Sequence, residues 1–160
     1  MSNPGNGAVH RAVMRRSLDE VARAVEGGAR VDDLDQGGRT ALFYAALEGR
    51  VDILAKLLEH GARTNIRDKA GKTPLHFAAS GYQPAAVRLL LDHGAEIDAQ
   101  DAHGNTPLSD AVYESMGRGD VIGILLQAGA DRTLPNNHGV SPASLAHTIA
   151  NYDVRQFFQE

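Results

Sequence analysis

Histidines are the side chains of this 160-residue chain best suited to bind a metal or move a proton, and there are seven. His103 and His138 occupy the same place in two successive loop segments, 35 residues apart. Stacking of those segments would bring the two imidazoles together, where they could share a metal or an acidic partner group. Two nitrogen ligands without a clear third make a weak metal site. We therefore expect exposed loop residues and no cofactor.

Spacings typical of catalysis are missing from the sequence. Gly71-Lys72-Thr73 resembles the end of a phosphate-binding loop, but that motif needs a glycine five residues before Gly71, where Ile66 stands. Without cysteine, the chain has no cysteine nucleophile, disulfide or thiolate zinc site. Paired carboxylates such as Asp32 and Asp33 need a pocket that shifts their proton affinity before they can act as acid and base. We predict that the protein is not an enzyme, and we keep catalysis as a remote alternative.

Composition narrows the possible partners. A formal net charge of −4 disfavours attraction to nucleic acid, which needs a concentrated basic face. No apolar run approaches the roughly 18 to 20 residues of a membrane helix, and the first residues carry neither a basic nor an apolar stretch. Since the lack of cysteine also fits a reducing compartment, we expect a soluble cytoplasmic protein that binds neither nucleic acid nor membrane.

Two short signals recur in phase along the chain. The openings are Thr40-Ala41-Leu42, Thr73-Pro74-Leu75, Thr106-Pro107-Leu108 and Ser141-Pro142-Ala143, and the closings are Gly28-Ala29, Gly61-Ala62, Gly94-Ala95 and Gly129-Ala130. Both series are spaced by 33, 33 and 35 residues. Two markers with one common period predict stacked copies of a supersecondary unit, that is, a solenoid.

Each unit has the signals of two helices. In the third unit Thr73 can cap the first helix, and Pro74 suits its first turn because the missing N–H costs nothing there. Small residues such as Ala79 allow close approach of neighbouring units, while leucines around Leu90 supply apolar bulk to the second helix. Gly94 is expected to end that helix in a left-handed conformation.

Two fragments of the third unit carry a family resemblance: Thr73-Pro74-Leu75-His76-Phe77-Ala78-Ala79 and Leu89-Leu90-Leu91-Asp92-His93-Gly94-Ala95-Glu96-Ile97-Asp98-Ala99. They resemble the ankyrin repeat. The resemblance implies an all-α ankyrin-repeat solenoid of five stacked helix–turn–helix units with β-hairpin-like turns, in which the first and last units act as caps. It also implies protein binding, because the family consists of interaction modules.

The resemblance further implies a structural role for His76, and His10 occupies the same phase in the first unit. His60 and His93 both precede a Gly-Ala closing pair, where an imidazole can hydrogen-bond the end of a helix. His147 is expected to be packed rather than functional. These five histidines are thus set apart from the two at the loop tips.

The repeat phase predicts the domain organisation. Residues 1–7 are expected to form a flexible N-terminus and residues 8–160 a single domain, with units at about 8–34, 35–67, 68–100, 101–135 and 136–160. Ser17 and Glu20 fit a reciprocal capping box at the start of a helix in the first unit. In the last unit we expect a short second helix over about 153–159, with Phe157 and Phe158 packed on the fourth unit.

Recognition positions are those that caps, glycines and core leave variable, namely the turn tips and the exposed side of each first helix. Met14, Leu47 and Tyr113 are large apolar residues at the same helix position, which is typical either of an interface or of contact between neighbouring units. The partner-binding residues we predict are Met14, Arg15, Arg39, Leu47, Glu48, Lys69, Lys72, His103, Asn105, Asp110, Tyr113, Glu114, His138 and Ile149.

Asp110 is the most specific member of that set. It stands where Tyr44 and Phe77 stand in the preceding units, so an acid replaces an aromatic side chain at a position expected to be packed. A carboxylate there must either reach the groove or find hydrogen bonds. We predict a binding role for Asp110 beside Tyr113 and Glu114.

The leading functional hypothesis is a protein, monomeric on its own, that captures one protein partner with its concave face and turn tips. The segments 136–142 and 149–154 resemble compact bacterial ankyrin proteins, and this resemblance implies a narrower hypothesis: an immunity or regulatory protein that inhibits a toxin or an enzyme. A structural scaffold or homo-oligomeric adaptor is the alternative.

Overall fold

The computed structural model describes residues 7–149 and 153–159, and this part of the chain folds into nine α-helices and one 3-10 helix. The helices are α1 (Ala8–Met14), α2 (Leu18–Glu26), α3 (Ala41–Leu47), α4 (Val51–Glu59), α5 (Pro74–Ser80), α6 (Pro84–Asp92), α7 (Pro107–Glu114), α8 (Asp120–Gln127), α9 (Pro142–Thr148) and the 3-10 helix η1 (Arg155–Phe158). Successive pairs form units one to five. The expected flexible N-terminus lies outside the described residues except for Gly7.

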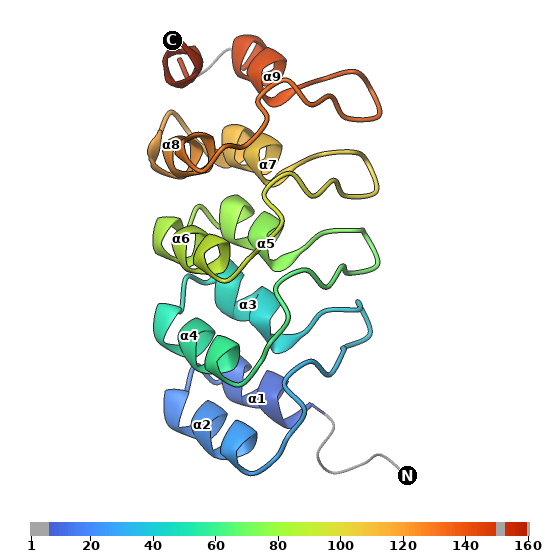
Figure 1. The fold of residues 1–160 in the computed structure, drawn as a ribbon, viewed down its shortest axis with the longest axis vertical. Helices are drawn as coiled ribbons and strands as arrows, with labels where there is room; N and C mark the ends of the chain where they lie inside the picture. The colour runs from blue at the N-terminus through green and yellow to red at the C-terminus, as the bar shows by residue number, and fades with distance from the viewer. Residues whose placement is uncertain (1–6, 150–152, 160) are drawn as a thin grey trace.

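The helices stack in two layers (Figure 1). One layer holds α1, α3, α5, α7 and α9, each in contact with the next, and the other holds α2, α4, α6 and α8. The turns between units project from the side of the first layer, and the two ends of the chain lie at opposite ends of the stack. No strand occurs among residues 7–149 and 153–159. The predicted all-α solenoid is confirmed.

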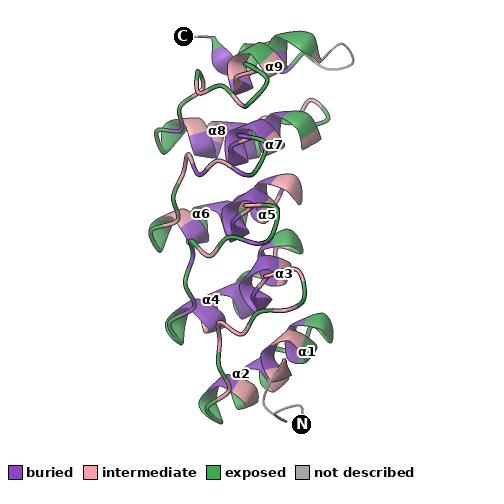
Figure 2. Cartoon of the chain, turned by 90° about the vertical axis from the view of Figure 1, so that its right-hand side faces the viewer, coloured by how far each residue is buried: buried purple, intermediate pink, exposed green. Residues whose placement is uncertain are grey.

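The core runs through the stack instead of sitting at one centre. The first turns of α3, α5 and α7 each contain a completely buried leucine, namely Leu42, Leu75 and Leu108. Figure 2 shows buried residues along the facing sides of the helices in units two to four, whereas α9 is largely intermediate or exposed. In the last unit Ala143 replaces the buried leucine and is only half-buried. The terminal unit therefore contributes less apolar burial than the central ones.

Hydroxyl residues stand at the N-cap of four of the first-layer helices, α3, α5, α7 and α9. Thr106 Oγ1 accepts the Ser109 N–H at 3.3 Å, and Ser141 Oγ accepts the Ser144 N–H at 3.2 Å. Proline follows at the first helical position in α5, α7 and α9. The predicted combination of a polar cap and a proline at N1 is thus how these helices start.

His76 links two units through both ring nitrogens. Its Nδ1 accepts the Thr73 N–H at 3.1 Å, so Nε2 carries the hydrogen and donates to the Asn105 carbonyl of the next unit at 3.0 Å. Burial lowers the pKa of His76, which holds the ring neutral. His10 Nε2 makes the corresponding contact with the Arg39 carbonyl at 2.9 Å. The structural role predicted for both is confirmed.

Three other histidines hydrogen-bond the carbonyl four residues before them. His60 and His93 do so at the ends of α4 and α6, as predicted. His147 contacts the Ala143 carbonyl but is exposed, so the expectation that it is packed is wrong. His147 lies on the exposed side of α9, in the last unit that the structure describes.

The projecting turns share one construction. The first residue of each turn, Asp35, Asp68, Asp101 or Asn136, accepts two backbone N–H groups of its own turn with Oδ1. Neighbouring tips are joined by backbone bonds, for example from the Ala102 N–H to the Ala70 carbonyl at 2.9 Å. Gly71 has φ +76°, and a Cβ there would lie 2.8 Å from the Ala102 nitrogen. The stacked tips therefore need glycine at this point.

Two local predictions need correction. Ser17 Oγ accepts the Glu20 N–H, but the Glu20 carboxylate pairs with Arg15 at 3.1 Å instead of completing the capping box. The second helix of unit five is η1, four residues of 3-10 helix, because so short a segment closes i→i+3 turns more readily than α-turns. Phe158 is buried and the Phe157 ring packs against Gly119 of unit four, as predicted.

Candidate binding groove

The first-layer helices and the turns beside them enclose two hollows. The C-terminal hollow, of about 380 Å³, is lined by Asn105, Ser109, Asp110, Tyr113, Asn136, His138, Val140 and Leu145. The N-terminal hollow, of about 520 Å³, is lined by Gly7, His10, Arg11, Met14, Leu34, Asp35, Gln36 and Tyr44. Met14 and Tyr113 hold the same position in units one and four, and Tyr44 and Leu145 do so in units two and five. The hollows are therefore the same feature three units apart.

Large apolar side chains are exposed at both hollows. Met14 is 62% and Tyr113 is 73% exposed, and Leu34 beside the N-terminal hollow is 58% exposed. Leu47 lies between them in the same register at 37% exposure. Because folding does not bury these side chains, they are free to contact another molecule.

At the junction of units two and three, the side chain of Arg39 fills the space that corresponds to these hollows. Arg39 Nε donates to Asp68 Oδ2 at 3.0 Å, and its guanidinium carbon lies 5.0 Å from the centre of the Phe77 ring. The hydrogen bond to Asp68 raises the pKa of the Arg39 guanidinium. Arg39 thus joins two units and is not a free recognition residue.

At the junction of units three and four, a lysine has this place. Lys72 Nζ lies 2.7 Å from Asp110 Oδ2 and 3.9 Å from Asp101 Oδ2. The Ser80 hydroxyl donates to the same Asp110 oxygen at 3.3 Å. Asp110 therefore makes hydrogen bonds and also lines the C-terminal hollow. Access to the groove and internal hydrogen bonding, predicted as alternatives for this carboxylate, thus occur together.

At the junction of units four and five, the equivalent residue is Asn105. Its Oδ1 accepts a hydrogen bond from Asn136 Nδ2 at 2.8 Å, so two short amides replace the cation and carboxylate of the earlier junctions. An asparagine is too short to reach Leu145, which stands where Phe77 and Asp110 stand. The space that Arg39 and Lys72 occupy in their own junctions is left open here as the C-terminal hollow.

The N-terminal hollow has a tyrosine and a carboxylate on one wall. The Tyr44 hydroxyl donates to Asp35 Oδ2. Burial raises the pKa of the Asp35 carboxyl, but the hydrogen bonds from Tyr44 and from the backbone N–H groups of Arg39 and Gly37 outweigh it and lower the pKa overall. Burial and the bond to Asp35 raise the pKa of Tyr44. Asp35 thus stays ionised and bound in its turn.

The structure divides the predicted binding residues into three groups. Asn105, Asp110, Tyr113 and His138 line the C-terminal hollow, and Met14 lines the N-terminal one. Arg15, Arg39, Glu48 and Lys72 are in ion pairs, with Glu20, Asp68, Arg16 and Asp110 respectively. Leu47, Lys69, His103 and Glu114 lie outside both hollows, and Ile149 packs against the core.

The tip histidines His103 and His138 lie on the turns of units four and five. His103 and His138 are both exposed, and only His138 lines a hollow. The described residues contain no group of three or more His, Cys, Asp or Glu side chains placed to hold a metal ion.

Sequence reasoning missed several residues of the hollows. Ser109, Asn136 and Leu145 line the C-terminal hollow, and Leu34 and Tyr44 line the N-terminal one. The repeat register was the usable signal, because Leu145 and Tyr44 share the variable position of Asp110. What the register could not show is which of these positions would be left uncovered.

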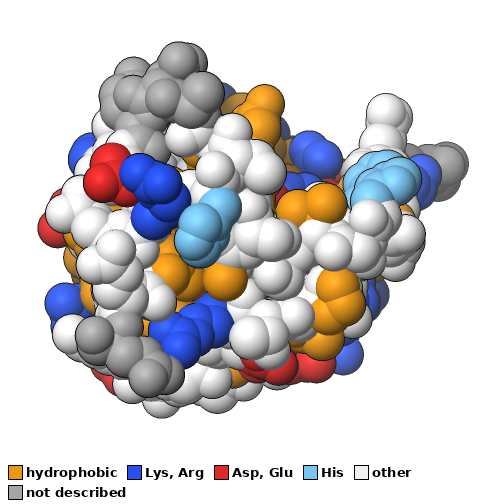
Figure 3. Space-filling model, turned by 90° about the horizontal axis from the view of Figure 1, so that it is seen from above, with side chains coloured by type: hydrophobic (Ala, Val, Ile, Leu, Met, Phe, Trp, Pro, Cys, Tyr) orange, Lys and Arg blue, Asp and Glu red, His pale blue; other side chains and the backbone are white. Residues whose placement is uncertain are grey.

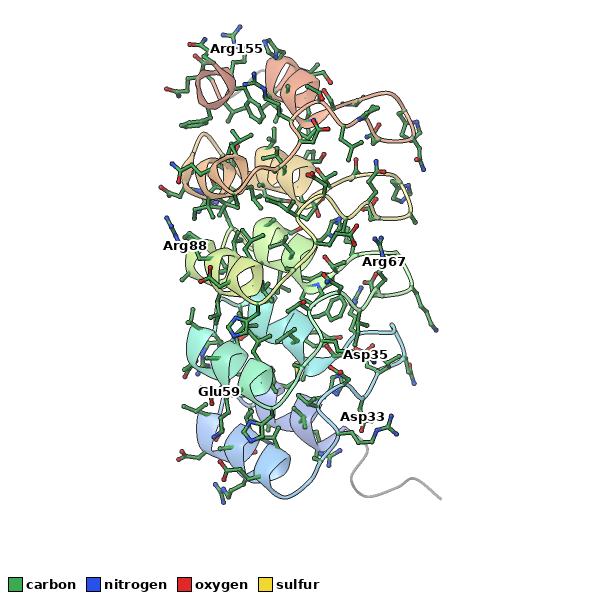
Figure 4. All side chains as sticks on the ribbon, viewed as in Figure 1. Asp33, Asp35, Glu59, Arg67, Arg88 and Arg155 are labelled. Atoms are coloured by element: carbon green, nitrogen blue, oxygen red, sulfur yellow. The ribbon has the colours of Figure 1, made fainter. Side chains whose placement is uncertain are left out.

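Charged side chains of both signs lie on the side of the turns and on the outer layer (Figure 4). Figure 4 shows Asp35 and Arg67 on the side of the turns and Glu59 and Arg88 on the outer layer. Arg67 is committed to its neighbours, since it donates to the Gln100 carbonyl and pairs with Glu96 at 3.4 Å. Viewed from the C-terminal end, hydrophobic side chains reach the surface among polar ones (Figure 3).

Comparison with known families agrees with this architecture. The family model for ankyrin repeats (3 copies) matches residues 1–68 and 61–136. Comparison with curated proteins gave no match. No helix in the described part of the chain is long and apolar enough to cross a bilayer. Because the two matches together span most of the sequence, the chain belongs to the ankyrin repeat family, whose members are typically non-catalytic protein–protein interaction modules.

Proposed function

We propose that this protein binds one protein partner through the groove between its first-layer helices and its turns. The observation that carries the proposal is the pair of equivalent hollows with Met14 and Tyr113 exposed on the same surface. Exposed apolar anchors ringed by polar side chains are typical of interface hot spots. An interface of standard size, about 1,600 Å² in total, would span both hollows.

In this proposal, residues 8–160 act as one domain of five units. Met14, Leu47 and Tyr113 supply apolar contacts, while Lys69, His103 and His138 contact the partner from the turn tips. Arg39 and Lys72 hold the units together and shape the groove between the hollows. A cytoplasmic location, a monomeric state without the partner and inhibition of a toxin or enzyme stay predictions of the sequence.

Affinity capture with matched variants tests the proposal. Immobilised wild type, a groove variant (Met14→Ala with Tyr113→Ala) and an outer-layer control (Glu59→Ala with Arg88→Ala) would be exposed to lysate of the native cell. We expect a defined protein that the wild type and the control retain and that the groove variant loses. Titration calorimetry with that purified protein should show affinity weaker by about tenfold or more for the groove variant.

Equal retention by all three proteins, or loss with the outer-layer control only, would contradict binding through the groove. Circular dichroism and urea unfolding of each variant serve as the folding control, because all four substituted side chains are exposed and their truncation should leave the stability nearly unchanged.

A further inference from the structure

The C-terminal hollow carries more acid than its own cations balance. Lys72 faces two carboxylates, those of Asp110 and Asp101. The carboxylates of Asp110 and Asp101 thus share one lysine beside this end of the groove. A partner group placed here would gain from a positive charge.

One oxygen of Asp110 is left to accept a new hydrogen bond. Both the Lys72 ammonium and the Ser80 hydroxyl donate to Oδ2, and no described residue donates to Oδ1. Arg118 lies near in sequence but is held elsewhere, with its guanidinium 3.9 Å from the centre of the Tyr82 ring and its Nε on the Ser115 carbonyl. The protein's own cations therefore leave an acceptor open at the hollow.

The walls suit a long side chain with a flat polar end. Tyr113 offers an exposed aromatic ring, and Val140 and Leu145 offer apolar surface for an aliphatic stem. A volume of about 380 Å³ is at the small end of the range of ligand pockets and suits one side chain better than a helix. A planar guanidinium can stack on the ring and donate to the carboxylate at once, whereas an ammonium cannot do both as well.

The molecule itself shows the arrangement at another junction. Between units two and three, Arg39 lies over the Phe77 ring and donates to the Asp68 carboxylate. Between units four and five, Asn105 stands at the position of Arg39, and the arginine is missing. The equivalents of Phe77 and Asp68 at this second place are Leu145 and Asn136, so the ring and the carboxylate that line the hollow come instead from Tyr113 and Asp110 of unit four.

We propose that the C-terminal hollow binds an arginine side chain from an exposed segment of the protein partner, with the guanidinium on the Tyr113 ring and on Asp110 Oδ1. The inference rests on the proposed protein-binding function and names the chemistry of its contact. In effect the partner supplies the cation that Arg39 and Lys72 supply within the chain.

A defined peptide tests this contact without the natural partner. Acetyl-Gly-Arg-Gly-amide would be titrated into ¹⁵N-labelled protein at low salt and followed by ¹H–¹⁵N spectra, beside the same peptide with citrulline or lysine in place of arginine. We expect saturable shifts that include the amides of Tyr113, Val140 and Leu145. The citrulline and lysine peptides should bind more weakly, by about threefold or more.

Three variants locate the contact. Tyr113→Ala should weaken binding by about threefold, through loss of the stacked ring. Asn105→Arg should abolish it, because this change places in the hollow the arginine that unit two has in Arg39. Val51→Ala, a control at an exposed apolar residue of α4 in the outer layer, should leave the affinity unchanged. Each spectrum also shows whether its variant is folded. If Tyr113→Ala loses the native spectrum, Tyr113→Leu replaces it, with the same expected loss of affinity.

Absence of saturable shifts with the arginine peptide, equal binding of the citrulline or lysine peptide, or full binding by folded Asn105→Arg would each overturn the inference. These results separate it from the proposed function. Groove-dependent capture of a protein without arginine binding removes the inference alone, whereas arginine binding without groove-dependent capture removes the proposed function alone.

Discussion

The junction of units three and four and the junction of units four and five have the same helices and turns, but side chains fill the first and leave a hollow in the second. In the first, Lys72 spans to Asp110 and Asp101, and His76 ties Thr73 to the Asn105 carbonyl. In the second, the side chains of Asn105 and Asn136 hydrogen-bond to each other, and a hollow opens between Tyr113 and Leu145. The helices and turns are alike, so the difference comes from a few side chains.

This contrast shows how a repeat protein separates stability from recognition. Caps, core leucines and the hydrogen bonds of the turns recur in both junctions and hold the stack. The residue type varies at the position of Arg39, Lys72 and Asn105. The length of the side chain there decides whether the protein itself fills the groove or leaves it open to a partner. We expect substitutions at the recurring positions to cost stability and substitutions at the variable one to change the groove.

The largest effect is expected from the core of unit four. Leu108→Ala removes a completely buried side chain between α7 and its neighbours and should lower the free energy of unfolding by about 2–5 kcal/mol. Leu145→Ala in unit five is the matched change at a half-buried position and should cost clearly less. Urea unfolding would measure both. Equal costs would show that the terminal unit is packed as firmly as the central ones.

The next effect concerns the link between units three and four. His76→Phe removes the partners of the Thr73 N–H and the Asn105 carbonyl and should cost about 1–3 kcal/mol in urea unfolding. Unit two is the natural reference, because Phe43 stands at this position and the buried Thr40 hydroxyl has no hydrogen-bond partner among the described residues. A variant as stable as the wild type would mean that the histidine link adds nothing beyond packing.

The same histidine predicts a pH dependence. Burial lowers the pKa of His76 below the ordinary value of 6.5, so the unfolded chain binds more protons between the two pKa values. The contribution of His76 is therefore complete above about pH 6.5 and is lost as the pH falls below that value. The stability difference between wild type and His76→Phe should shrink from pH 7.5 to pH 5. A constant difference would contradict a neutral buried imidazole.

A smaller effect is expected when the closed junction is converted into the open one. Lys72→Asn copies Asn105, removes the cation between Asp110 and Asp101, and should lower stability by about 1 kcal/mol. It should also open a new hollow beside Ser80, visible in a crystal structure. Lys69→Asn at the neighbouring exposed tip is the control and should change neither. A groove that stays closed would show that other side chains fill this junction.

The smallest effect is expected in the linker of unit four. Met116 is 64% exposed with φ +49°, whereas Gly49 has the corresponding place in unit two with φ +65°. Met116→Gly relieves the left-handed strain but adds freedom to the unfolded chain, so the stability should change by less than about 1 kcal/mol. Thermal unfolding would detect a larger change in either direction, which would indicate that the Met116 side chain has a packing role.

Much of the fold followed from local patterns. The 33-residue period, the capping threonines and the proline at N1 placed the first-layer helices, and the extra residues of unit four lie in the linker 115–119, where unit three has only 81–83. The fifth unit was less predictable, because the type of helix that η1 forms depends on how a short segment packs on α8 and α9. The repeat register identified three residues of the candidate site, Tyr113, Asp110 and Met14. Tyr113 and Met14 stand at a helix position where an exposed large apolar residue recurs from unit to unit, and Asp110 stands at the variable position of Tyr44 and Phe77.

The sequence by itself determined the repeat, the helix pairs and the structural histidines, because these depend on residues close in the chain or at one fixed period. Only the tertiary structure decided that Arg39 stacks on Phe77, that Lys72 neutralises Asp110 and that Asn105 leaves a hollow open. The physical reason is that these side chains meet across unit junctions, where length and rotamer determine contact. The pattern of residue types along the sequence does not show which side chains come into contact across a junction.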